Sequence, residues 1–227
     1  MSILINLNSK VLAKGAAVPK PLEKGKMRLY GMRFCPFVQR VMIYLVKKNI
    51  PVEVVNIKPR DVPEWYSSMH FKNQIPALEV GGFKETVIEL LFDRINAFNQ
   101  TFFAVVGIVK SEEGKAEKYA ALVKAFEEIE ALLTADFFSG SSSPGFVDYM
   151  VFPSLQRVLW LAHIFPDFPL STKSFPGSSA FPKLSSWYAK MEKLPEVVEA
   201  GPVDELGVTY FDAYIRGNTD CFDYGLD

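Results

Sequence analysis

The hydrophobic and polar positions of the chain change their period near residue 90. Before that point, short apolar runs alternate with amphipathic segments, which predicts strands separated by helices. After it, apolar residues recur at intervals of three and four, as on one face of a helix, and no convincing strand pattern appears. The pattern therefore predicts an α/β domain followed by an all-α domain.

The α/β part is predicted to have the order βαβαββ. Its strands are expected at residues 27–32, 51–57, 75–80 and 83–88, with a helix at 37–49 and a short helix or loop at 62–70. Helices of the second part are expected at residues 87–109, 112–133, 145–165 and 182–194. Residues 1–26 contain Pro and Gly breaks and little periodicity, so we interpret them as an extended N-terminal arm. This places the α/β domain at 27–90 and the helical domain at 91–227.

Composition and charge narrow the classes of function. With 227 residues, 49% of them hydrophobic, the chain is long enough to bury a substantial core. Its 25 Lys and Arg residues nearly balance 26 Asp and Glu residues, which argues against nucleic acid as a partner. The apolar runs are shorter than the roughly 20 residues that span a bilayer, so no stable membrane insertion is expected. The N-terminal residues do not resemble a secretory signal, and a cytoplasmic location is expected.

One of the two cysteines, Cys35, stands where a predicted strand ends and a predicted helix begins. Pro36 suits the first helical position, where its missing N–H costs nothing. Unpaired amides and the positive end of the helix dipole favour an anion there, so we expect the pKa of the Cys35 thiol to lie below its usual value. Arg33 is expected to add to this effect. Val38 replaces the second cysteine of a Cys-x-x-Cys motif, which predicts monothiol chemistry with an external resolving thiol.

Two interpretations of Cys35 stay open on these grounds, a reactive thiol and a buried structural cysteine. The Ile75-Pro76 pair favours the first, because a proline at the start of a strand is often cis and faces the active thiol in thioredoxin-like folds. An ordinary edge-strand proline is the alternative. His70 and His163 are the only histidines and stand far apart in the sequence, so no metal site is expected.

Five segments together resemble the omega-class glutathione transferases, including the insect members, over most of the chain. They are "MRFCPFVQR", "PEWY", "IPALEV", "VDYMVFPSLQR" and "CFDYGL". The resemblance implies a thioredoxin-like domain that binds glutathione, a helical bundle domain and, usually, a homodimer. It also implies thioltransferase or dehydroascorbate reductase activity on small electrophilic or disulfide substrates. One insect branch of the family makes pyrimidodiazepine for eye pigment.

The resemblance assigns roles to residues of a glutathione site. Cys35 matches the catalytic cysteine, and Phe37 is expected beside the glutathione. Ile75 and Pro76 match residues whose backbone groups pair with the cysteinyl part of glutathione. Glu89 matches the acid that holds the γ-glutamyl amine. Glutathione is thus implied as the co-substrate, without a metal.

Further roles follow from the same resemblance. Val62 occupies the place of a lysine that contacts glutathione in the family, so one charged contact is lost and a lower glutathione affinity is expected. In the helical domain, Arg157 and Tyr214 match positions that line the neighbouring hydrophobic-substrate site. Asp148 is expected to buttress the start of a buried helix rather than to be solvated.

A second departure from the family pattern follows Glu89. Roughly thirty residues of that pattern are absent, including the helix that covers one face of the sheet and belongs to the dimer seam. Exposing that face costs about 25 cal/mol per Å² of apolar area. Three explanations remain open: the helix at 87–106 slides back over the sheet, the domain is less stable, or the sequence lacks a segment of the native product. The homodimer depends on which explanation holds.

The favoured interpretation is a glutathione-dependent thiol transferase or dehydroascorbate reductase that forms a mixed disulfide at Cys35. One alternative is a non-catalytic or weakly active glutathione-transferase-like binding protein, suggested by Val62 and the absent segment. The others are a pyrimidodiazepine synthase-type activity and a membrane-associating relative of the chloride-channel-like proteins, which share the thiol motif.

Overall fold

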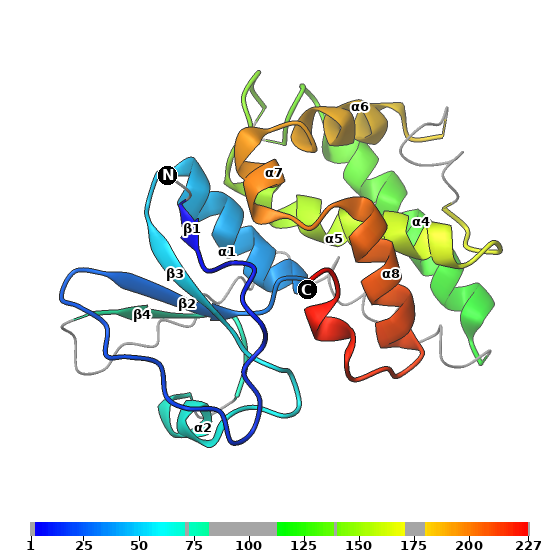
Figure 1. Cartoon of the computed structure of the whole chain (residues 1–227). Helices are drawn as coiled ribbons and strands as arrows, with labels where there is room; N and C mark the ends of the chain where they lie inside the picture. The colour runs from blue at the N-terminus through cyan, green and yellow to red at the C-terminus, as the bar shows by residue number, and fades with distance from the viewer. Residues whose placement is uncertain (1–2, 71–72, 82–112, 139, 171–179, 227) are drawn as a thin grey trace. The chain divides into compact units, whose positions relative to one another are not determined.

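The chain divides into two compact units in a computed structural model that describes residues 3–70, 73–81, 113–138, 140–170 and 180–226. The first unit contains Met1–Leu91, Glu199–Pro202 and Thr219–Asp227, and the second contains Phe92–Val198 and Val203–Asn218. The helices and strands of both are labelled in Figure 1. The final residues of the chain thus belong to the same unit as its beginning.

A mixed four-stranded sheet forms the centre of the first unit, with the strand order β1-β3-β2-β4. The strands are β1 Leu4–Ile5, β2 Met27–Gly31, β3 Val52–Asn56 and β4 Ala77–Val80. Both β1 and β2 run parallel to β3, whereas β4 runs antiparallel to β2. A parallel pair needs a crossover, and helix α1 between β2 and β3 supplies it.

Helix α1, Pro36–Lys47, follows β2, and its apolar positions are buried as their spacing predicts. Val38 and Val41 are at most 3% exposed. The approach to β2 is close, because a Cβ added at Gly31 would lie 2.5 Å from Cγ1 of Val38. Glycine at the end of β2 therefore lets the first turn of α1 pack directly on the strand.

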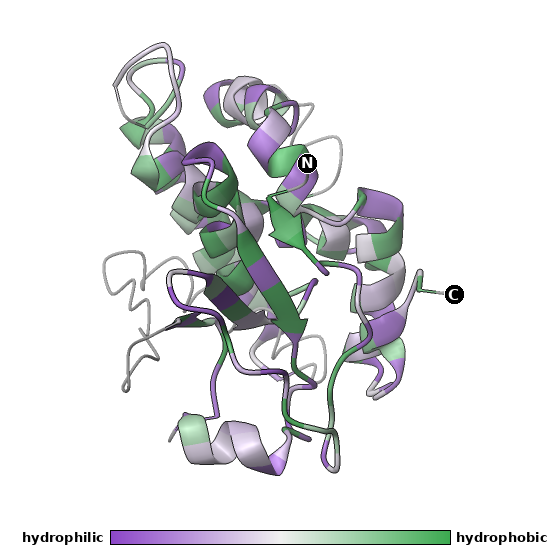
Figure 2. Ribbon diagram, turned by 60° about the vertical axis from the view of Figure 1, so that its left-hand side comes forward, coloured by the Kyte–Doolittle hydropathy of each residue, from purple (hydrophilic) through white to green (hydrophobic). Residues whose placement is uncertain are grey.

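A second apolar cluster, which we call the aromatic cluster, covers the opposite face of the sheet. Its buried members are Tyr30, Val55, Ile57, Tyr66 and Ala77. Tyr30 pairs with Val55 in the β2–β3 register, so their side chains share one face. Tyr66 comes from α2, Glu64–Met69, and its ring centroid lies 5.3 Å from that of Tyr30. Figure 2 shows α2 as mostly hydrophilic or neutral, and the side chains that it contributes to the aromatic cluster are Tyr66 and the partly buried Trp65.

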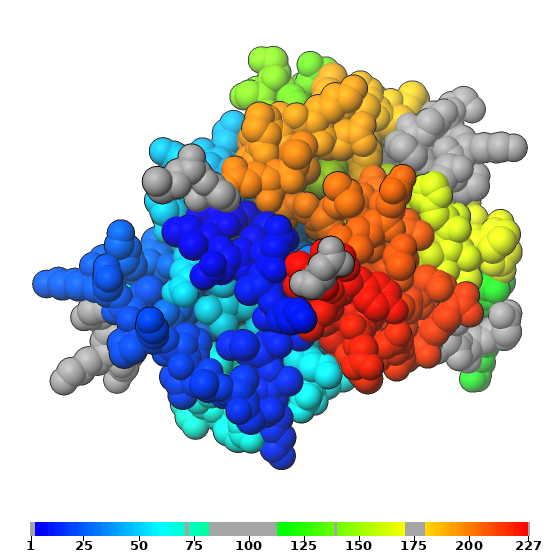
Figure 3. Space-filling model, in the orientation of Figure 1, coloured from blue at the N-terminus to red at the C-terminus, as the bar shows by residue number. Residues whose placement is uncertain are grey.

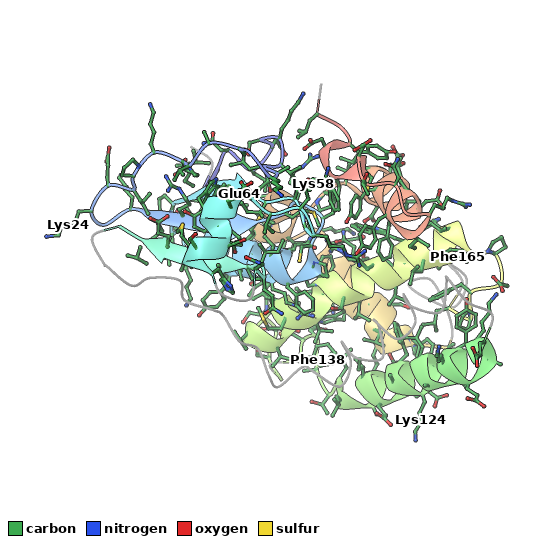
Figure 4. The ribbon with its side chains drawn as sticks, turned by 90° about the horizontal axis from the view of Figure 1, so that it is seen from below. Lys24, Lys58, Glu64, Lys124, Phe138 and Phe165 are labelled. Carbon is green, nitrogen blue, oxygen red and sulfur yellow. The ribbon has the colours of Figure 1, made fainter. Side chains whose placement is uncertain are left out.

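The N-terminal arm is fastened to the same sheet. Leu12 N donates to Asn56 O at 2.8 Å, and Lys58 N donates to Leu12 O at 2.9 Å. Glu64, labelled in Figure 4, accepts a hydrogen bond from Gly15 N at 3.0 Å. The arm's own periodicity predicts no strand, yet its start forms β1. That strand exists through its pairing with the distant β3.

The second unit is helical in its described residues. Its helices are α4 Lys115–Leu132, α5 Phe146–Ile164, α6 Pro182–Met191 and α8 Asp204–Ile215, and α7 Pro195–Ala200 begins in it. Every residue of α5 from Asp148 to Leu161 is buried. A helix that is apolar on nearly all sides is typical of the interior of a bundle, and α5 is the central helix here.

Asp148 determines how α5 begins. Its Oδ1 accepts hydrogen bonds from Phe138 N at 2.8 Å and Trp187 Nε1 at 2.7 Å, and its Oδ2 accepts from Gly145 N at 2.7 Å. Phe138 is labelled in Figure 4 at the start of α5. The carboxylate is fully buried. The predicted buttressing role of Asp148 is confirmed, because one side chain joins the preceding loop, the helix start and α6.

Helix α8 packs closely on α5. A Cβ added at Gly207 would lie 2.2 Å from Cζ2 of Trp160, so only glycine permits this approach. Asp204 Oδ1, at the first position of α8, accepts hydrogen bonds from Trp160 Nε1 and Gln156 Nε2, both at 2.9 Å. Contacts with α5 therefore hold α8 in place.

The predicted elements are confirmed wherever the described residues contain them. This applies to strands β2, β3 and β4 and to helices α1, α2, α4, α5 and α6. Strand β1 and helices α7 and α8 were not predicted. The expected strand at 83–88, the helix at 87–109 and the question of what covers the sheet lie outside the described residues. Among the described helices, none combines the length and the hydropathy that crossing a bilayer would require.

Candidate active site

Cys35 stands at the N-cap of α1, as its sequence position predicts. Its backbone is extended, with φ −76° and ψ 120°, while its carbonyl already accepts the first helical hydrogen bond from Gln39 N at 2.9 Å. Pro36 occupies the first helical turn. The residue is partly exposed. A side chain at this position lies beside amide groups that have no partner within the helix, and these stabilise a negative charge.

The preceding loop is a tight turn. Cys35 N donates to Met32 O at 3.0 Å, and Phe34 N contacts Sδ of Met32 at 3.1 Å. Met32 and Phe34 are buried. Both contacts to Met32 therefore fix the backbone between the end of β2 and the start of α1. The position of Cys35 thus depends on the sheet from which this loop leaves.

Arg40, in the second turn of α1, is electrostatically coupled to Cys35. Its guanidinium lies 5.0 Å from the centroid of the Phe37 ring, and the residue is 1% exposed. Burial lowers the pKa of Arg40 to about 10, and attraction to a negative Cys35 opposes that decrease. The same attraction favours the thiolate over the thiol. Sequence reasoning missed this residue, although an arginine within the buried stripe of α1 was a visible signal.

Arg33, two residues before Cys35, donates its hydrogen bonds to the end of the chain. Its Nη2 donates to Tyr224 O at 2.7 Å and to Phe222 O at 3.4 Å. Its guanidinium carbon lies 4.9 Å from the ring centroid of Phe34. Arg40 thus interacts electrostatically with Cys35, and the hydrogen bonds of Arg33 hold the C-terminal residues. The expected effect of Arg33 on the Cys35 thiol stays a prediction.

Pro76 lies next to the loop that carries Cys35. The Ile75-Pro76 peptide bond is cis, as the sequence suggests. Strand β4 pairs Ala77 with Tyr30 in an antiparallel register, which places Pro76 opposite the end of β2. The chain reaches Met32 directly after that point. The fold thus brings Pro76 to the edge of the sheet where α1 begins.

The other expected glutathione contacts have different positions. Val62 and Ile75 are partly buried and both pack against the aromatic cluster, one before α2 and one before β4. Phe37 lies in the first turn of α1, under the guanidinium of Arg40. Glu89 lies outside the described residues. The binding of glutathione by these residues stays a prediction.

Arg157 and Tyr214 belong to the second unit. Arg157 is 1% exposed, donates to Pro153 O at 3.1 Å and lies over the ring of Trp160, 4.4 Å from its centroid. Tyr214 is half-buried on α8, and its ring centroid lies 5.8 Å from that of Tyr210. Both residues thus join an aromatic part of their unit. Their role in a hydrophobic-substrate site stays a prediction.

The second cysteine, Cys221, and the two histidines do not lie together in a candidate metal site within the described residues. Cys221 is not part of a disulfide and has no exposed surface, and burial raises the pKa of its thiol. His70 is buried and stacks on Tyr66, whereas His163 is exposed. The described ranges contain no group of three or more His, Cys, Asp and Glu residues that could hold a metal ion.

Comparison with known proteins identifies both parts of the chain. Residues 29–89 match the family model of the glutathione S-transferase N-terminal domain, and residues 112–190 match that of the C-terminal domain. The chain is 45% identical to a probable glutathione transferase omega-2 of Caenorhabditis briggsae and 40% identical to one of Caenorhabditis elegans, over the whole length of all three chains. Glutathione transferase omega 1C of Trametes versicolor has a similar crystal structure, with a TM-score of 0.67 and 17% identity, covering 86% of this chain and 98% of that one.

The first of these alignments also bears on the absent segment. It extends over 255 positions, whereas the chain has 227 residues, so at least 28 positions of the relative have no counterpart here. This agrees with the gap that the sequence pattern indicates. The place expected for it, after Glu89, lies outside the described residues.

Proposed function

The chain belongs to the omega-class glutathione transferases, and from this membership we propose that it is a glutathione-dependent thiol transferase with Cys35 as its nucleophile. Dehydroascorbate would be a second type of substrate. The observation that carries the proposal is the position of Cys35 at the N-cap of α1, with Arg40 coupled to it. Both features favour the thiolate, which is the reactive form of cysteine.

The proposed reaction has two steps. The Cys35 thiolate attacks the glutathione sulfur of a mixed disulfide, a new S–S bond forms, and the other thiol leaves and takes up a proton. A second glutathione thiolate then attacks the Cys35 adduct, so that oxidised glutathione leaves and the Cys35 thiolate returns. Val38 cannot resolve the adduct as a second cysteine would, which is why an external thiol is needed.

With dehydroascorbate the electron balance is similar. Two glutathione molecules are oxidised to one disulfide, and the two electrons and two protons reduce dehydroascorbate to ascorbate. Ile75, Pro76 and Phe37 are proposed to hold the glutathione during these steps, and no metal is required. Neither Cys35 nor Cys221 is part of a disulfide, and we propose a reducing compartment such as the cytosol as the site of action. The homodimer and the pyrimidodiazepine synthase-type activity stay predictions.

A direct test is the mass of the intact protein after incubation with oxidised glutathione. We expect one glutathione adduct, mapped to Cys35 by peptide analysis, which reduced glutathione removes. Cys221 serves as the internal control, because its buried thiol should stay unmodified in the folded protein. An adduct on neither cysteine would contradict the proposal and favour the non-catalytic binding protein.

A second test restores at position 62 the lysine that the family has there. Substituting Val62→Lys should lower the Kd for glutathione about threefold to tenfold, because it restores a charged contact worth roughly 1 kcal/mol. The aliphatic stem of lysine can keep the packing that Val62 makes on the aromatic cluster. Isothermal titration calorimetry measures the change.

Val62→Met is the matched control, since methionine has a similar length and no charge. An equal gain in both variants would show that side-chain size, rather than charge, limits the affinity. No gain in either would remove Val62 from the glutathione site.

A further inference from the structure

The C-terminal segment, residues 219–226, lies against the first unit close to the active-site loop. Cys221–Asp223 form a short 3-10 helix in which Cys221 and Phe222 are buried. Figure 3 shows these red residues in contact with the blue N-terminal arm, and both belong to the first unit. The C-terminal segment is therefore packed as an integral part of the first unit.

Two sets of hydrogen bonds hold the segment. Oδ1 of Asp223 accepts from Val11 N in the arm at 2.9 Å. The carbonyls of Phe222 and Tyr224 accept from Nη2 of Arg33, at 3.4 Å and 2.7 Å. These contacts join residues about 190 to 210 positions apart in the sequence, so local pattern does not produce them.

Arg33 connects the C-terminal segment to the loop of Cys35, which stands two residues further along the chain. Arg33 is 7% exposed, and its guanidinium also lies over the ring of Phe34. Burial lowers the pKa of Arg33, and the Asp223 carboxylate opposes that decrease. A buried guanidinium needs acceptors for its donors, and the chain supplies backbone carbonyls of the C-terminal segment.

A continuous series of hydrogen bonds connects the active-site loop to the sheet through the C-terminal segment. Arg33 is bonded to the C-terminal segment, whose Asp223 is bonded to Val11, and the adjoining Leu12 is bonded to Asn56 of β3. Strand β3 pairs with β2, which leads back into the loop. A loop that is restrained at both ends and at its central side chain keeps Cys35 in one geometry relative to the first turn of α1.

We propose that Arg33 is a positioning residue for Cys35 and that it acts through the C-terminal segment, which holds its guanidinium. This rests on the proposed function in one respect, namely that Cys35 is the reactive thiol. It goes beyond that function by making the last residues of the chain part of the active-site structure.

The experiment measures the rate at which iodoacetamide alkylates Cys35 as a function of pH, followed on the Cys35 peptide by mass spectrometry. Arg33→Met and Asp223→Ala should each move the profile to higher pH and lower the rate below the pKa about tenfold, which corresponds to one pKa unit. Arg33→Lys should recover part of the effect. Arg216→Met is the matched control, because Arg216 is exposed and pairs with Asp212 on α8, separately from the hydrogen bonds of Arg33 and Asp223.

A variant with both substitutions tests whether Arg33 acts on Cys35 through the C-terminal segment. If Arg33 acts through the C-terminal segment, then Arg33→Met with Asp223→Ala should shift the profile no further than Arg33→Met alone. A shift in Arg33→Met but not in Asp223→Ala, or shifts that add, would overturn the proposal in favour of a direct charge effect. Unchanged profiles with lower melting temperatures would also overturn it, because Arg33 would then only stabilise the fold.

Asp223→Ala keeps the test available if Arg33→Met fails to fold, since that change leaves Arg33 and its acceptor carbonyls in the chain. The outcome is separate from that of the proposed function. The glutathione adduct of the unchanged protein decides the function, whereas the differences among variants decide the role of Arg33.

Discussion

Cys35→Ser should reduce thiol transfer from a glutathione mixed disulfide to the uncatalysed rate, a loss of more than about 1000-fold. A serine hydroxyl cannot form the S–S bond on which both proposed steps depend, and at neutral pH it is not ionised. The measurement is glutathione release coupled to its enzymatic reduction. The position at the N-cap of α1 makes this change conservative for the fold, since serine is itself a preferred N-cap residue.

The control for Cys35→Ser is its stability. Its melting temperature should equal or slightly exceed that of the unchanged protein, which separates a chemical loss from an unfolded sample. Retained turnover in a folded Cys35→Ser protein would mean that Cys35 is not the nucleophile. Cys35→Ala, which lacks both the thiol and the hydroxyl, should be as inactive as Cys35→Ser and somewhat less stable than it.

Asp148→Ala should lower the free energy of unfolding by about 3 to 5 kcal/mol. Three donors lose their acceptor at once, namely the amides of Phe138 and Gly145 and the indole N–H of Trp187. All three hydrogen bonds are made to a charged group, and the carboxylate has no exposed surface. Against a typical total of 5 to 15 kcal/mol, such a loss brings the helical unit close to unfolding at 37 °C.

Urea denaturation followed by tryptophan fluorescence measures this effect, because Trp187 is itself a partner of Asp148. Asp148→Asn keeps one acceptor oxygen and should lose about half as much stability. Asp212→Ala is the matched control on an exposed pair and should cost less than about 1 kcal/mol. Equal losses at Asp148 and Asp212 would contradict the buttressing role.

Local pattern was a reliable guide where it reflects short-range geometry. The apolar spacing of α1 and of α4, and the proline and glycine boundaries of β3 and β4, are properties of neighbouring residues. Cys35 followed by proline indicates a helix start for the same reason. These elements could therefore be located before any tertiary contact was known.

Pattern did not reveal elements that depend on packing. Helix α8 contains Gly207 and several residues that favour strands, so its propensity is weak. It forms because Gly207 allows contact with Trp160 and because Asp204 binds two side chains of α5. Strand β1 has only two residues and depends on the pairing surface that β3 offers.

The charged side chains near Cys35 also show that sequence pattern does not predict features that depend on packing. Arg33 is closer in sequence, yet its guanidinium is directed to carbonyls 189 and 191 residues away. Arg40 is further from Cys35 in the sequence, yet its charge interacts with Cys35. The direction of a long side chain is set by the acceptors around it, and those come from segments that sequence distance cannot identify.

The order of the elements, the thiol at the helix start and membership of the omega class are thus determined by the sequence alone, because each depends on residues close together or on a family pattern. Only the tertiary structure decided that Arg40 interacts with Cys35, that Asp148 joins three segments, and that the end of the chain binds Arg33. Those features arise when distant donors and acceptors are buried together, since each buried polar group must then find a partner wherever the fold provides one.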